Sequence, residues 1–157
     1  GIFSALAAAA VFYLIYRWVN NRKTKRLILE SQKPLLTPLE EFKKALQEIE
    51  QGGYVSKAQF KKHYFGLSEV SKKFLGKAFE FDAEERTTRE LMAELKTRGF
   101  SEDLLLQWKT LFEEMDLIKF TDQTPEKTLA ATLSRRIDEI VQGSWSTSPL
   151  SRRPPTP

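Results

Sequence analysis

Few side chains in this sequence are placed to do chemistry. His63 is the only histidine among 157 residues, and the two residues before it are lysines, which offer no carboxylate or hydroxyl partner. Asp82, Glu84 and Glu85 form an acidic cluster before a predicted helix, and paired carboxylates can perform acid–base chemistry or hold a metal ion. Acidic side chains at such a position also stabilise a helix N-terminus. We therefore interpret the cluster as structural and expect His63 to lie partly exposed on a helix surface.

The motifs of common enzymes are absent from the sequence. It has no cysteine, which excludes a disulfide scaffold, a thiol nucleophile and a cysteine-ligated metal. It also has no Gly-rich phosphate loop, nucleophile elbow, paired-histidine zinc motif or EF-hand loop. We therefore predict that the chain is not an enzyme and uses no cofactor, metal ion or small-molecule substrate. An unrecognised enzyme that uses Glu84, Glu85 or His63 is an alternative, and a convergent polar pocket would support it.

The sequence begins with an uncharged, mostly apolar run, and the segments that carry the residues discussed above follow it. Residues 1–16 carry no charge and precede Arg17 and Trp18, whose side chains suit a membrane interface. A helix of that length spans about 24 Å, short of the roughly 30 Å hydrocarbon core of a bilayer. The chain begins with Gly1 and not with Met, so we expect a longer natural protein whose apolar run continues upstream. We predict a transmembrane helix over residues 1–19.

A basic block follows the apolar run and predicts its orientation. Residues 1–33 carry six basic side chains and one acidic side chain, and positive charge concentrates on the cytoplasmic side of membrane proteins. The folded part should therefore lie in the cytoplasm, with residues 20–34 as a juxtamembrane segment attracted to the anionic headgroups of the lipid bilayer. A buried core helix and a cleaved signal peptide are the alternatives, but the charges of a signal peptide should precede its apolar run. The residues predicted to lie at the membrane interface are Arg17, Trp18, Arg22, Lys23, Lys25 and Arg26.

The rest of the chain is mildly acidic. Residues 34–143 carry 17 basic and 20 acidic side chains, a net charge of −3, although the whole chain has a net charge of +4. The excess of basic residues lies in the N-terminal block and in two arginines near the C-terminus. This distribution favours a membrane surface over a nucleic acid as the partner of the basic residues.

Five amphipathic helix candidates follow one another over residues 35–143, which we predict to form an all-α five-helix bundle. Most of them have a start signal, either a capping box or a Ser or Thr N-cap. Residues 117–120 are the segment that could instead be extended. The predicted helix starts are Thr37, Ser56, Thr87, Ser101 and Thr124. The predicted common core consists of Phe60, Tyr64, Leu67, Phe74, Trp108, Leu111, Leu117 and Leu133.

The third and fourth candidate helices have the outline of a helix-turn-helix, which could be winged-helix-like. Such units read DNA, and they also bind proteins. The second helix of the pair carries five acidic side chains against Lys109, and so acidic a recognition helix would repel phosphate. We therefore expect this unit to bind protein and the chain to bind no nucleic acid.

The composition changes at Ser144. The last residues are mostly Ser, Thr, Pro and Arg, and such a segment buries too little apolar surface to order itself. We predict a disordered tail over residues 144–157.

The stretch from residue 64 to 91, YFGLSEVSKKFLGKAFEFDAEERTTREL, resembles the cytoplasmic C-terminal domain of BatD-like proteins. The segment Asp116–Phe120 is similar to the Asp-Leu-aliphatic-Lys-Phe segment of that family, and the preceding apolar helix with its basic stop also fits. Gly76 stands where the family usually has an acidic residue, and Glu80 where it usually has glycine. The residues that carry the resemblance in the longer stretch are Tyr64, Leu67, Ser68, Lys72, Lys73, Phe74, Leu75, Phe79, Ala83, Glu85, Thr87, Thr88, Glu90 and Leu91.

The resemblance implies partners for the predicted domain. BatD-like proteins are single-pass bacterial proteins encoded in Bat (aerotolerance) operons beside a MoxR-type AAA+ ATPase and von Willebrand factor A proteins. The resemblance thus implies an inner-membrane protein with a role in envelope stress tolerance or complex assembly. It implies the ATPase and the von Willebrand factor A proteins as partners, and it implies no catalytic residues. We expect an adaptor whose cytoplasmic domain docks a partner, with the ATPase as the leading candidate. A membrane-bound transcription regulator with a helix-turn-helix domain is the alternative.

Four charged residues in the family-like segments are candidates for the docking surface. They are Glu84, Glu85, Arg86 and Lys119, which we expect to be exposed and to steer a protein partner. A purely structural account competes with this one. In that account Thr87 caps a helix, Glu90 completes its capping box, and Leu117 and Phe120 fill the core.

Overall fold

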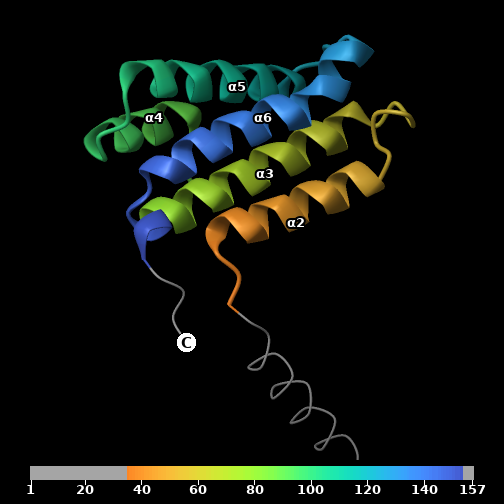
Figure 1. The fold of residues 1–157 in the computed structure, drawn as a ribbon. Helices are drawn as coiled ribbons and strands as arrows, with labels where there is room; N and C mark the ends of the chain where they lie inside the picture. Colours follow the sequence, from red (N-terminus) through yellow and green to blue (C-terminus); the bar gives the residue numbers. More distant parts are fainter. Residues whose placement is uncertain (1–34, 154–157) are drawn as a thin grey trace, which may run out of the picture. The chain divides into compact units, whose positions relative to one another are not determined.

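The computed structural model describes residues 35–153, and this part of the chain is all-α, as predicted (Figure 1). The helices are α2 (Pro38–Gln51), α3 (Phe60–Phe79), α4 (Thr88–Thr97), α5 (Glu102–Phe120) and α6 (Lys127–Thr147), followed by the short 3₁₀ helix η1 (Pro149–Arg152). None of the helices in this range is long and apolar enough to cross a membrane.

The predicted membrane anchor falls in a different part of the chain. The helix predicted over residues 1–19 and the basic segment predicted over 20–34 lie outside the described residues. The same is true of the predicted interface residues Arg17, Trp18, Arg22, Lys23, Lys25 and Arg26. These predictions stay predictions.

Two capping boxes begin helices where the sequence places them. The Thr37 side chain accepts a hydrogen bond from the Glu40 backbone N–H, and the Glu40 carboxylate accepts one from the Thr37 backbone N–H. Thr87 and Glu90 make the same reciprocal bonds at the start of α4. Each box satisfies backbone donors that the first turn of a helix leaves free.

The helix starts predicted at Ser56 and Thr124 are wrong, the second because α6 begins only at Lys127. The Ser56 hydroxyl donates to the carbonyl of Gly53, 2.8 Å away, and so closes a turn that follows α2. Gly53 and Ala58 have positive φ angles of 62° and 54°, a conformation that cannot continue a right-handed helix. The helix α3 therefore begins at Phe60, and its N-cap residue makes no side-chain capping bond.

Helix α3 lies at the centre of the domain and packs against α2, α5 and α6, whereas α4 packs against α5 (Figure 1). Most of the predicted core is buried, namely Tyr64, Leu67, Phe74, Trp108, Leu111 and Leu133. Phe60 is only half-buried and Leu117 is 45% exposed.

The exposure of Leu117 follows from the conformation of its segment. Residues 117–120 are helical and not extended, because α5 continues without a break to Phe120. In a helix the residues on one face recur every three or four positions, so Ile118 falls on the buried face with Met115 and Leu111. Leu117 is thereby rotated toward solvent.

The prediction of a disordered tail from Ser144 is wrong over residues 144–153. Helix α6 continues to Thr147 and η1 follows it. The Trp108 indole N–H donates to the Ser144 hydroxyl over 2.9 Å, and the Ser148 hydroxyl donates to the Ala78 carbonyl over 2.6 Å. Long-range hydrogen bonds order this segment, and its polar composition gives no sign of them.

His63 is buried, which also corrects the expectation of an exposed helix-surface histidine. Only 4% of it is exposed, and its Nε2 lies 3.0 Å from the carbonyl of Ala130 on α6. A carbonyl only accepts, so Nε2 carries the proton of a neutral imidazole. Burial lowers the pKa of His63, and this effect outweighs the hydrogen bond to Ala130 and the charge of Glu50, which both raise it.

The lowered pKa of His63 predicts acid sensitivity. Between the two pKa values the unfolded chain binds more protons than the folded one, so stability should be complete above the ordinary pKa of 6.5 and should fall as the pH drops below it. Urea unfolding of residues 35–157 at about pH 7.5 and about pH 5.5 measures this loss. A His63→Gln variant, whose amide can still donate to Ala130, should lose less stability across the same range. Equal losses in both proteins would show that other groups cause the pH dependence.

Candidate functional site

The two family-like segments, residues 64–91 and 116–120, meet in one hydrogen-bonded network. The Lys119 ammonium on α5 donates to the Ser68 hydroxyl on α3 over 3.1 Å and pairs with the Asp116 carboxylate at 3.6 Å. The Thr88 hydroxyl, in the first turn of α4, donates to the other oxygen of Asp116 over 2.5 Å. We call Ser68, Thr88, Asp116 and Lys119 the core network, because it joins three helices.

Lys119 lies inside this network and not on the exposed surface that the sequence predicts. Its side chain is 8% exposed. Its ammonium nitrogen also lies 5.1 Å from the ring centre of Phe65 and 4.9 Å from that of Phe120, distances that allow cation–π attraction. Lys119 therefore positions other groups and offers little surface to a partner.

Lys72 lies close to the core network, about one helical turn beyond Ser68. Its ammonium donates to the backbone carbonyl of Arg86 over 2.5 Å, which ties α3 to the loop before α4. Burial lowers the pKa of Lys72, as does the charge of Lys119, while the charges of Asp116, Glu85 and Glu90 oppose the shift.

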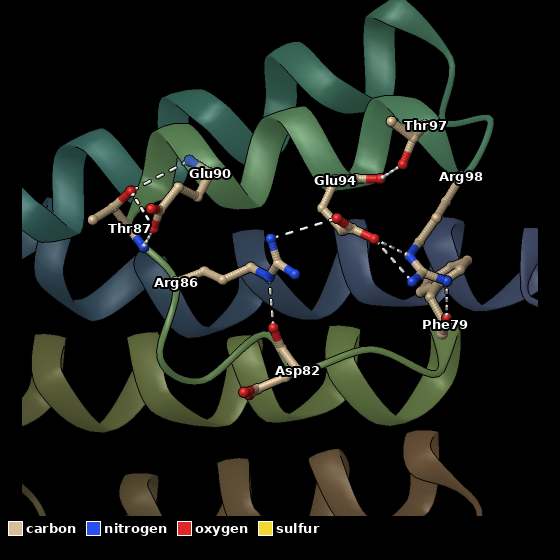
Figure 2. A network of polar contacts seen from close by, with 8 residues as sticks. All are labelled: Phe79, Asp82, Arg86, Thr87, Glu90, Glu94, Thr97 and Arg98. Carbon is tan, nitrogen blue, oxygen red and sulfur yellow. Dashed lines mark hydrogen bonds and ion pairs between the residues drawn. The ribbon is translucent and has the colours of Figure 1, made fainter.

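Arg86 is held by a second set of internal contacts (Figure 2). Its Nε donates to the Asp82 carbonyl over 2.7 Å, and its guanidinium lies 3.4 Å from the Glu94 carboxylate. Arg98 pairs with the same carboxylate at 2.9 Å and donates to the Phe79 carbonyl over 2.7 Å. These contacts hold the loop of residues 80–87 against α4, so Arg86 mainly stabilises the fold.

Glu84 and Glu85 are the predicted docking residues that remain available. Both are exposed, and neither side chain makes a hydrogen bond or ion pair with any residue in the range 35–153. They line one side of a cleft of about 500 Å³ between the α3–α4 loop and helix α3. The other polar residues that line the cleft are Ser68, Glu69, Lys72, Lys73 and Lys119.

An exposed aromatic pair borders this cleft. Phe65 lines it and meets Phe120 edge to face, with ring centres 6.2 Å apart and planes at 83°. Phe65 is 41% exposed and Phe120 is 70% exposed. The three- and four-residue spacing of buried side chains in α3 includes Tyr64 and excludes Phe65, and in α5 it includes Ile118 and excludes Phe120. This spacing is the sequence signal that could have located both rings at the surface.

The helix-turn-helix outline is present as α4 and α5. The inner face of α5 is filled by buried residues that include Trp108, Phe112 and Met115. Its first turn carries Glu102 and Asp103, and residues 35–153 contain no strand that could form a wing. Among the exposed charged side chains of α5, Glu102, Asp103 and Glu113 outnumber Lys109.

Two titratable side chains outside the cleft, His63 and Tyr64, belong to the core. Burial raises the pKa of the Tyr64 phenol to about 12, the charge of Glu114 acting in the same direction, so the hydroxyl stays protonated at neutral pH. His63 is enclosed between α3 and α6. Within residues 35–153 no group of three or more His, Asp or Glu side chains could hold a metal ion. The cleft itself is lined by charged side chains and by the Phe65 ring, which can make ionic and aromatic contacts.

Comparison of the whole chain with protein-family models, with curated proteins and with solved structures finds no match.

Proposed function

We propose that this chain is a membrane-anchored adaptor whose helical domain docks a cytoplasmic protein partner. The observation that carries the proposal is the exposed, unpaired pair Glu84 and Glu85 at the edge of a cleft. Exposed charges that make no hydrogen bond or ion pair within residues 35–153 contribute little to the fold, whereas at the rim of an interface they speed association and select partners. The neighbouring Lys72, Arg86 and Lys119 hold the walls in place.

A rigid site of this kind suits an adaptor. Walls fixed by internal hydrogen bonds lose little conformational freedom when a partner binds, which lowers the cost of association. The resemblance to BatD-like domains supports a MoxR-type AAA+ ATPase as the partner, and von Willebrand factor A proteins as members of the same membrane complex. In this proposal the anchor lies in a bacterial inner membrane, and the complex acts in envelope stress tolerance or assembly.

The proposal predicts a charge-dependent interaction. Full-length protein extracted from membranes should retain a MoxR-type ATPase, identified by mass spectrometry, and Glu84→Lys with Glu85→Lys should slow its association while thermal stability stays nearly unchanged. The slowing should shrink at high salt, because salt screens exposed charges. Reversal of Glu48 and Asp122, which are exposed charges on α2 and on the α5–α6 loop, is the matched control and should have little effect.

Two results would contradict the adaptor function. Unchanged partner binding after reversal of Glu84 and Glu85 would leave these residues without a docking role. Tight, sequence-selective binding of duplex DNA by residues 34–157 would instead favour a transcription regulator. We expect only weak, non-specific DNA binding, because 19 basic against 20 acidic side chains in those residues leave little net charge to neutralise phosphates.

A further inference from the structure

We infer that the cleft and its aromatic border take a peptide segment that presents a large apolar side chain together with an arginine. The inference rests on the proposed adaptor function and names the chemistry of the partner. The apolar side chain packs on the Phe65–Phe120 pair, and the guanidinium lies between Glu69 on α3 and the carboxylates of Glu84 and Glu85 in the loop.

The aromatic pair provides the apolar anchor of this surface. Phe120 is the more exposed of the two rings, at 70%, and Leu117, one turn earlier on α5, is 45% exposed. Large apolar groups at such exposure lose contact with water when a partner covers them, and aromatic anchors carry much of the energy of protein interfaces. The Lys119 ammonium near both rings holds them in place without covering them.

The free charges select a basic partner. Glu69, Glu84 and Glu85 are exposed and make no ion pair within residues 35–153, and Lys73 is the exposed cation that lines the cleft with them. The other two ammonium groups are engaged, since Lys119 pairs with Asp116 and Lys72 donates to a backbone carbonyl. An acidic segment would meet three unpaired carboxylates, whereas a guanidinium can bind carboxylates with two hydrogen bonds.

The distribution of charge along α3 also gives the segment a direction. Lys61 and Lys62 are exposed one turn before Phe65, and Glu69 lies one turn after it. An arginine on the Lys61 side would be repelled, and one on the Glu69 side would be attracted. The apolar residue should therefore lie over Phe65 with the arginine displaced toward Glu69.

Peptide binding to the full-length chain tests the inference. The chain is held in nanodiscs of zwitterionic lipid, which do not attract basic peptides, and empty nanodiscs give the background. The probes are fluorescein-labelled Gly/Ser peptides of about twelve residues that carry one leucine and one arginine at varied spacing. At least one spacing should bind with a dissociation constant below about 1 mM, and replacement of its arginine by glutamate should weaken binding about tenfold.

Variants of the chain localise the binding. Glu84→Lys with Glu85→Lys should reverse the preference, so that the glutamate peptide binds better than the arginine peptide. Phe120→Ser should weaken both peptides at every salt concentration, because it removes apolar contact. The Glu48 and Asp122 double reversal should bind like the unchanged protein. Circular dichroism establishes that each variant is folded.

Three results would overturn the inference. The first is tighter binding of the glutamate peptide by the unchanged chain, and the second is peptide affinity that stays the same in the Glu84 and Glu85 reversal and in Phe120→Ser. The third is no binding of any peptide at about 1 mM. The adaptor function fails separately. If a cytoplasmic partner is retained through Glu84 and Glu85 but no arginine peptide binds, then only the chemistry assigned to the partner is wrong. If an arginine peptide binds at the cleft but no partner is retained, then the adaptor function is wrong.

Discussion

Replacing Phe74 with alanine should lower the free energy of unfolding by about 3–5 kcal/mol, the range for deletion of a fully packed aromatic side chain. Phe74 is 2% exposed. Its ring centre lies 5.8 Å from that of Phe42 on α2 and 6.4 Å from that of Trp145 on α6. The substitution would thus open a cavity where three helices meet.

Urea unfolding of residues 35–157 measures this loss. Lys73→Ala is the matched control, because Lys73 is exposed next to Phe74 on the same helix and should change stability by less than about 0.5 kcal/mol. A loss below about 1 kcal/mol for Phe74→Ala would mean that the neighbouring side chains collapse into the space, or that the ring is less packed than its burial indicates.

Ending the chain after Gly143 should destabilise the domain by roughly 3 kcal/mol or more. The deletion removes the Ser144 hydroxyl, which accepts from the Trp108 indole, and the Trp145 ring, which packs on Phe74. It also removes η1, which packs against α3 and α6. Such a loss is a large part of the roughly 5–15 kcal/mol by which domains are stable.

A shorter deletion provides the control for this experiment. Ending the chain after Arg153 removes only four residues and leaves every contact named above in place, so the midpoint of thermal unfolding should stay nearly unchanged. If both truncated chains unfold at the same temperature, then residues 144–153 add nothing to the stability of the domain.

Local signals in the sequence predicted much of the fold. Capping boxes at Thr37 and Thr87 place two helix starts, because the reciprocal bonds of such a box involve only residues three positions apart. The three- and four-residue spacing of apolar side chains in α3 also predicted most of its buried face. At Ser56 the same type of signal failed, since its hydroxyl bonds backward to Gly53 and not forward into a helix.

The candidate site was predicted less well than the fold. All four candidate docking residues lie in the two family-like segments, and two of them, Glu84 and Glu85, are exposed beside the cleft. Lys119 and Arg86 have the same charged character in sequence but are held by internal partners. The amino-acid sequence alone does not show whether a charged side chain has a partner on another helix.

The sequence by itself determined the helical class of residues 35–153, the helix starts at Thr37, Thr87 and Ser101, and the confinement of excess positive charge to the N-terminal block and the tail arginines. These properties depend on residues close together in the chain or on composition alone. Only the tertiary structure decided that His63 is buried against Ala130, that Ser144 and Ser148 hold the end of the chain to the core, and that Lys119 belongs to the core network. Each of these contacts joins residues 36 to 70 positions apart. These contacts form only when the helices pack against one another. The sequence near either residue of a contact does not determine that packing.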